Sequence, residues 1–133
     1  MDVTQLFNKL EFHDSSIDAY MWSAPSGVLT LKIELCNFNQ DNYDEKTDPE
    51  TIPGELIFTD VRDIICDPAD ALTSWSKSTT RGIIEFNATP TEKGWSKVKL
   101  VLAIRDFVSR ATDTHVITFE ANDATWRPRP SSK

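Results

Sequence analysis

The sequence contains little of several residue types on which common functional motifs depend. Its 133 residues include only four Gly, two Cys and two His. A loop that cradles phosphate needs glycine, and no GxGxxG, P-loop, GxSxG or HExxH motif occurs. The sequence therefore predicts no catalytic residues and no cofactor, and a protein that is not an enzyme.

Cysteine and histidine are too few and too scattered to build a zinc framework. Cys36 and Cys66 lie thirty positions apart, with no CxxC spacing. We predict that both are buried free thiols that act as small hydrophobic side chains, with a disulfide or a reactive thiol as the alternatives. No metal site is predicted.

Long hydrophobic runs are also missing. The longest uncharged apolar runs span only a few residues, as in "LVLAI" at 100–104, so no segment is expected to cross a bilayer. The opening "MDVTQLFNKLEFHD" lacks the basic start and the apolar run of a signal peptide. We therefore expect no membrane association and, by default, a cytoplasmic location.

Basic residues are outnumbered by acidic ones. The chain has 14 Lys and Arg against 21 Asp and Glu, a net charge of −7 at pH 7. The last ten residues, "ATWRPRPSSK", hold three of the bases and no acid, so the body before them carries 21 acids against 11 bases. Such a surface repels phosphate backbones and disfavours nucleic-acid binding, whereas it suits a basic protein partner.

The chain does have the alternating pattern of β-strands, and its length and 39% hydrophobic content predict one domain with a single core. The clearest strand is "VLTLKIELC", in which alternate residues are apolar. The preceding "SIDAYMW" is expected to form a hairpin with it, with Ile17, Ala19 and Met21 on the face opposite to Tyr20 and Trp22. Further strands are predicted at "ELIFTDV" continuing into "DIIC", "RGIIEFNAT", "WSKVKLVLAIRD" and "THVITFEAN".

These patterns predict a mainly β fold, with about six mostly antiparallel strands in a sandwich or a strongly curved sheet. Asp2 precedes an apolar stripe that predicts a short N-terminal helix, and Asp67 followed by Pro68 predicts a second short helix near 68–76. Residues 1–123 are expected to form the single globular domain. Residues 124–133 are expected to be a basic, flexible tail, in which Trp126 either packs back onto the body or mediates a dimer.

A polar cluster stands where the N-terminal helix gives way to the first strand, at His13, Asp14 and Ser15. Adjacent residues of an extended chain point to opposite faces, so His13 and Asp14 are not expected to meet as a base and its orienting carboxylate. We expect Asp14 and Ser15 to bond nearby backbone amides and His13 to be partly buried. The alternative is a ligand-binding, metal-binding or hydrolytic site that uses His13, Asp14 and His115.

An acidic loop is predicted over 37–54, "NFNQDNYDEKTDPETIPG", and loops of this length are usually functional or mobile. Its five central acids are Asp41, Asp44, Glu45, Asp48 and Glu50. On an EF-hand template that starts at Asn39, Tyr43 and Asp44 stand where a ligand and an obligatory Gly belong, so an EF-hand is excluded. The loop is interpreted either as solvated or as partner-binding, with Tyr43 as an anchor among the carboxylates.

Four stretches resemble a group of small bacterial proteins of unknown or immunity-type function: "FHDSSIDAYMW", "GVLTLKIEL", "GELIFTDVRDI" and "VITFEAND". The most specific of them is the opening His13-Asp14-Ser15. Some members of this group are similar to the immunity proteins encoded beside polymorphic toxins. The resemblance implies a non-enzymatic inhibitor that covers the active site of a toxin, commonly a basic nuclease cleft.

The leading hypothesis is therefore a small macromolecule-binding protein. The resemblance implies that it is an immunity-like inhibitor, with a basic protein such as a toxin as its partner. The acidic residues of the loop and Tyr43 are the predicted contact surface. A third hypothesis is a homo-oligomeric structural protein, such as a homodimer that pairs through an exposed strand edge.

Overall fold

The computed structural model describes residues 2–41, 43–72, 79–92 and 94–129. Over these residues the chain forms one α-helix, one short 3-10 helix and eight strands. In chain order they are α1 (Val3–Lys9), β1 (Ser16–Ser23), β2 (Val28–Cys36), η1 (Asn37–Asn39), β3 (Thr51–Thr59), β4 (Arg62–Asp67), β5 (Thr79–Pro90), β6 (Ser96–Asp106), β7 (Thr112–Ala121) and β8 (Asp123–Pro128).

All eight strands belong to one antiparallel sheet with the order β4-β7-β6-β5-β1-β2-β3-β8. The prediction of a mainly β, mostly antiparallel fold with a short N-terminal helix is confirmed, but the estimate of about six strands is too low. One reason is that the stretch from "ELIFTDV" to "DIIC" divides into β3 and β4. Asp60, which lies between the two strands, adopts a left-handed backbone conformation with φ of 54°, and this interrupts the extended chain. Asp63, with φ of 57°, lies within β4 where its register with β7 shifts.

The other reason is the C-terminus, where the expected tail begins with a strand. β8 pairs with β3, with Trp126 opposite Leu56 and Pro128 opposite Gly54. The expected domain boundary at 123 therefore falls at the start of β8, and the prediction of a flexible tail is wrong for residues 124–128. Trp126 is half-buried and its ring lies 6.0 Å from that of Phe12, so this side chain packs onto the body. Residues 130–133 lie outside the described part of the chain.

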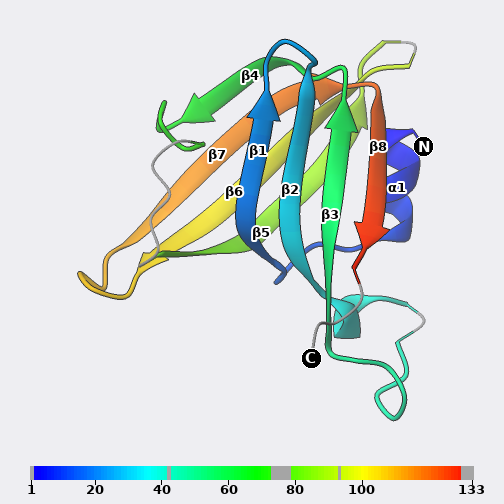
Figure 1. Ribbon diagram of the computed structural model, residues 1–133, viewed down its shortest axis with the longest axis vertical. Coiled ribbons are helices and arrows are strands. Elements are labelled where there is room, and N and C mark those ends of the chain that lie inside the picture. Colours follow the sequence, from blue (N-terminus) through cyan, green and yellow to red (C-terminus); the bar gives the residue numbers. More distant parts are fainter. Residues whose placement is uncertain (1, 42, 73–78, 93, 130–133) are drawn as a thin grey trace.

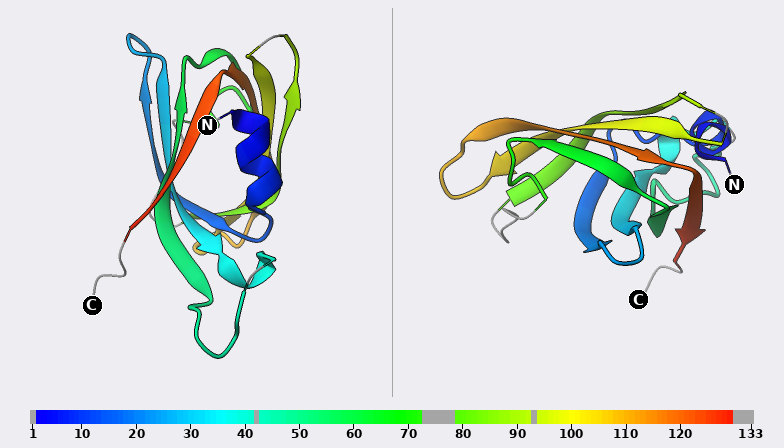
Figure 2. Two further views of the ribbon diagram at one scale, coloured as in Figure 1. Left: turned by 90° about the vertical axis from the view of Figure 1, so that its right-hand side faces the viewer. Right: turned by 90° about the horizontal axis from the view of Figure 1, so that it is seen from above.

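The sheet is strongly curved, and its two halves face each other (Figures 1 and 2). β1 and β5 pair only at Ser16 and Gly82, so the half made of β4, β7, β6 and β5 can turn away from the half made of β1, β2, β3 and β8. Across the interior, the rings of Phe58 on β3 and Phe119 on β7 are 4.9 Å apart. One curved sheet, rather than two separate sheets, therefore encloses the core.

Helix α1 covers the opening between β5 and β8 (Figure 2). Asp2 caps it as predicted, because its Oδ1 accepts hydrogen bonds from the backbone N–H groups of Thr4 and Gln5. The apolar stripe faces inward, with Leu6 buried and the ring of Phe7 4.8 Å from that of Phe86. The helix thus places its apolar face on a cluster of aromatic side chains inside the sheet.

The predicted orientation of the β1 side chains is wrong after Ile17. A β-bulge between Ile17 and Ala19 adds one residue to β1, which moves every later side chain to the other face. Tyr20 consequently lies opposite Leu31 and packs against the core, whereas Met21 is 54% exposed. A bulge of this kind cannot be predicted from the alternation of apolar and polar residues.

The prediction of a second short helix near 68–76 is also wrong for the part of this segment that the structure describes. Residues 68–72 form turns, and a hydrogen bond of 3.0 Å joins the Ala71 N–H to the Pro68 carbonyl. Ala71 and Leu72 are buried, so this turn packs onto the body, and most helical stability in proteins comes from such packing rather than from a capping signal. The rest of the predicted helix, with Trp75, lies outside the described residues. In the described part of the chain no helix is long and apolar enough to span a membrane.

Candidate functional site

The acidic loop joins β2 to β3 and extends beyond the end of the sheet (Figure 1). It is shorter than the predicted 37–54, because residues 51–54 already belong to β3 and residues 37–39 form η1. Two hydrogen bonds of Asn37 close its base. The Asn37 backbone N–H donates to the Glu50 carbonyl at 2.8 Å, and Asn37 Nδ2 donates to the Pro49 carbonyl at 2.8 Å. Because Asn37 is largely buried, these bonds are partly shielded from water and hold the two ends of the loop together.

Gln40 fastens the loop to the segment between α1 and β1. Its Oε1 accepts from the Glu11 backbone N–H at 2.9 Å, and its Nε2 donates to the carbonyls of Glu11 and Cys36 at 2.6 and 3.0 Å. Asn39 Nδ2 adds a bond of 2.9 Å to the carbonyl of His13. The acidic loop and the polar cluster at 13–15, which are far apart in sequence, therefore meet at one end of the molecule.

Two of the five acids predicted as partner contacts, Asp44 and Asp48, shape the loop. Asp48 Oδ2 accepts from the Asp44 N–H at 2.9 Å, Asp44 Oδ1 accepts from the Lys46 N–H at 3.0 Å, and the Asp48 N–H donates to the Asp44 carbonyl at 2.8 Å. These reciprocal bonds form a tight turn. The remaining predicted acids, Asp41, Glu45 and Glu50, are exposed.

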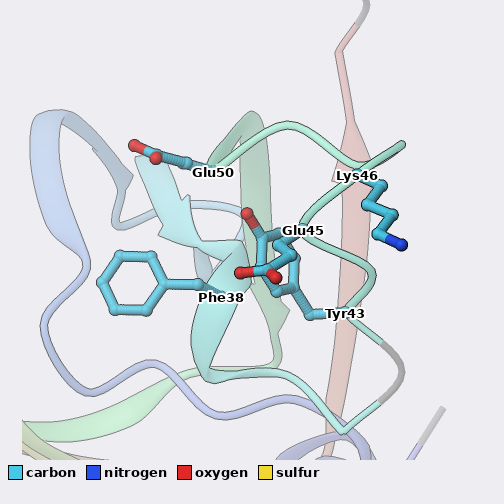
Figure 3. Close-up of a pocket in the computed structure, with 5 residues that line it drawn as sticks. All are labelled: Phe38, Tyr43, Glu45, Lys46 and Glu50. Atoms are coloured by element: carbon cyan, nitrogen blue, oxygen red, sulfur yellow. The ribbon is translucent and has the colours of Figure 1, made fainter.

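The loop carries a hollow of about 520 Å³ lined by Phe38, Tyr43, Glu45, Lys46 and Glu50 (Figure 3). Phe38 is 54% exposed. In Figure 3, Lys46 extends to the side of the loop away from Phe38. We refer to Phe38, Tyr43, Glu45 and Glu50 as the loop surface.

Phe38 was missed as a candidate from the sequence. It belongs to η1, directly after the last residue of β2, and the Asn residues on either side of it, Asn37 and Asn39, both donate hydrogen bonds that fix the backbone there. The sequence "NFN" after the strand could have indicated an exposed Phe38. That inference would have required knowing that the asparagine side chains point back to the body.

The loop surface has a negative electrostatic environment. Partial burial raises the pKa of the Tyr43 phenol, and the nearby carboxylates, led by Glu50 and Glu45, raise it further. The shift shows that the carboxylates surround the phenol closely enough to disfavour a further negative charge there. Among the described residues, no group of three or more His, Cys, Asp or Glu side chains is arranged to hold a metal ion.

His13 and Asp14 meet, contrary to the sequence-based expectation. His13 Nδ1 lies 3.2 Å from Asp14 Oδ2. The expectation assumed an extended backbone, but Asp14 has φ of 66°, and this left-handed conformation brings the two neighbouring side chains together. The prediction that His13 is partly buried is also wrong, since its side chain is 55% exposed.

Ser15 has a structural role inside the protein. It is 1% exposed, and its Oγ accepts a hydrogen bond of 2.8 Å from the Cys36 N–H on β2, not from a nearby amide as expected. The Asp14 carboxylate faces His13, and it is the Asp14 backbone N–H that donates to the Ile83 carbonyl at 3.1 Å. His115 is buried on β7. The exposed pair of His13 and Asp14 is therefore not joined by Ser15 or His115.

Cys36 and Cys66 are free thiols, as predicted. Cys36 is buried as expected, whereas Cys66 is only half-buried. Burial raises the pKa of both thiols, which leaves them protonated and weakly nucleophilic at neutral pH.

Comparison of the chain with protein-family models, with curated proteins and with solved structures finds no match. The fold and the site define an all-β protein with one strongly curved sheet and an ordered acidic loop.

Proposed function

We propose that this protein acts without catalysis, by binding a basic protein through the loop surface. The observation that carries the proposal is the order of the loop. Side chains of Asn37, Asn39 and Gln40 tie it to the body, while Phe38 stands exposed beside carboxylates. These ties restrict the conformations of the loop before a partner is bound.

The chemistry of the loop surface suits Lys and Arg side chains. Aromatic faces attract cations, and the carboxylates of Glu45 and Glu50 can pair with a guanidinium or ammonium group. A loop already held in its binding conformation loses less conformational entropy on association. The negative charge of the whole molecule also accelerates the encounter with a basic partner.

An inhibitor of the immunity type is the form of this function that we favour. Such a protein blocks a toxin by covering a basic cleft, for which it needs a complementary acidic surface and no catalytic group. The support lies in the charge of the loop and in the resemblance of the His13-Asp14-Ser15 opening to that class.

The test compares two doubly neutralised variants in capture from a lysate at low and high salt. Glu45→Gln with Glu50→Gln changes the loop surface, and Glu34→Gln with Asp113→Asn removes the same charge from exposed positions on β2 and β7. We expect a basic protein to be retained by the wild type and by the control pair, and to be lost with the loop pair. Equal retention by both pairs would contradict the proposal.

A second candidate function rests on the 3.2 Å contact between His13 Nδ1 and Asp14 Oδ2. An exposed imidazole beside a carboxylate can take part in binding a metal or a small ligand, as the alternative hypothesis requires. Titration calorimetry with Zn²⁺ tests it, because wild-type protein should then take up the ion and His13→Ala should not. Absence of binding by the wild type ends this candidate.

A further inference from the structure

The turn between β6 and β7 exposes two large apolar side chains. Phe107 is 63% exposed and Val108 is 83% exposed, and no other large hydrophobic residue in the described part of the chain exceeds the exposure of Val108. They stand at the end of the hairpin that β6 and β7 form. We call residues 105–110 the hairpin tip. Adjacent exposed apolar residues at such a position are typical of a contact surface.

The tip is ordered by its own polar groups. Asp106 Oδ1 accepts from the Val108 N–H at 2.8 Å and from the Ser109 N–H at 3.3 Å, and the Asp106 N–H donates to the Ala111 carbonyl at 2.9 Å. Ser109 Oγ accepts from the Ala111 N–H at 3.2 Å. The turn therefore presents Phe107 and Val108 in a fixed arrangement.

The tip is basic on an acidic protein. Arg105 and Arg110 are exposed on either side of the apolar pair, and the one acid among these six residues, Asp106, uses its carboxylate within the turn. A surface of this composition favours an acidic partner that also offers apolar contact area.

The loop surface has the complementary composition. It places the aromatic rings of Phe38 and Tyr43 beside the carboxylates of Glu45 and Glu50 around a hollow of about 520 Å³. Figures 1 and 2 show the end of the β6–β7 hairpin and the acidic loop at separate places on the molecule. One copy can therefore offer both surfaces at once.

We infer that the hairpin tip docks onto the loop surface of a second copy of this chain. Phe107 and Val108 enter the hollow against Phe38 and Tyr43, while Arg105 and Arg110 pair with Glu45 and Glu50. The contact joins two different surfaces, so it is head-to-tail and can extend beyond two copies. It differs from pairing through a strand edge.

This self-association does not depend on the proposed basic partner, although both use the loop surface. A partner would compete with the tip, so association of the chain with itself would reduce partner capture at high protein concentration. The two proposals are separable, because self-association is measured on purified protein alone and capture at concentrations where the chain is monomeric.

The experiment is sedimentation of the purified full chain and of three variants. The tip variant carries Phe107→Ser and Val108→Ser, the loop variant Glu45→Lys and Glu50→Lys, and the control replaces two apolar residues exposed elsewhere, Met21→Ser and Ile84→Ser. We expect wild type and control to increase in mass with concentration and to associate about tenfold more weakly in high salt. The tip and loop variants should each remain monomeric.

Mixing the tip variant with the loop variant is the decisive step. Each retains one intact surface, so an equimolar mixture should form a complex of one copy of each and should not grow further. A wild type that is monomeric at every concentration overturns the inference, and so do tip and loop variants that still associate alone. Binding of the tip to anionic phosphatidylserine vesicles by a monomeric wild type would also overturn it, by assigning the tip to a membrane.

Discussion

The ring of Trp126 on β8 lies directly over Gly54 on β3. A Cβ added at Gly54 would come within 2.5 Å of Trp126 Cη2 and within 2.9 Å of the Arg127 carbonyl oxygen. The absence of a side chain at Gly54 therefore allows β8 to pair closely with β3 while Trp126 covers the aromatic cluster that includes Phe12. The last strand of the sheet depends on this contact.

Replacing Gly54 with Ala should destabilise the protein by about 1–3 kcal/mol, because the Arg127 carbonyl belongs to the backbone and cannot move as freely as a side chain. Urea unfolding followed by tryptophan fluorescence measures the change. Gly82→Ala is the matched control, since a Cβ there meets nothing within 4 Å, and its effect should stay within about 0.5 kcal/mol. Equal effects at the two glycines would show that the Trp126 contact does not limit position 54.

Replacing Ser15 with Ala should cost about 1–3 kcal/mol, because it leaves the buried N–H of Cys36 without its acceptor. Ser26→Ala serves for comparison, since that hydroxyl is exposed and makes only a 3.4 Å bond to the Ser23 carbonyl. Thermal and urea unfolding of the two variants give the difference. A Ser15 variant as stable as the Ser26 variant would mean that water replaces the lost acceptor.

The stability contributed by the N-cap of α1 should depend on pH. The hydrogen bonds that Asp2 accepts, first from the Thr4 side chain and then from backbone amides, lower its pKa below the ordinary value of 3.8. A carboxyl with a lowered folded-state pKa contributes stability that is fully present above the unfolded-state pKa and is lost as pH falls through the folded-state value. Asp2→Ala should therefore cost about 0.5–2 kcal/mol at pH 7 and less at pH 2–3. A cost independent of pH would assign the effect to packing.

The parts of the fold that were predictable from sequence are those encoded by local patterns. In β2, Leu29, Leu31 and Ile33 alternate with exposed or half-exposed residues at Lys32 and Glu34, and no distant contact is needed to recognise the strand. The division of β3 from β4 follows instead from the backbone of Asp60, whose left-handed conformation is not specified by the neighbouring residue types. β8 depends on a long-range contact between Trp126 and Gly54, which a strand pattern of six residues cannot indicate.

The same distinction applies to the site. Composition was sufficient to identify the loop and its acids, because charge is a local property. It could not separate Asp44 and Asp48, which bond within a turn, from Glu45 and Glu50, which line the hollow. The contact between His13 and Asp14 and the hydrogen bonds between Gln40 and Glu11 depend on backbone geometry that the tertiary structure determines. They could not be predicted from local sequence.

Gln40 should control the order of the loop. Gln40→Ala removes its bonds to both backbone groups of Glu11 and to the Cys36 carbonyl, each worth about 0.5–1.5 kcal/mol. We expect faster hydrogen exchange at the Glu11 amide and weaker binding of the basic partner, since the loop would have to be ordered on binding. Thr47→Ala is the control within the same loop, because Thr47 is exposed, uncharged and not part of the lining of the hollow. If Gln40→Ala accelerated exchange but left affinity unchanged, preorganisation of the loop would not contribute to binding, and the charge of Glu45 and Glu50 alone would have to account for it.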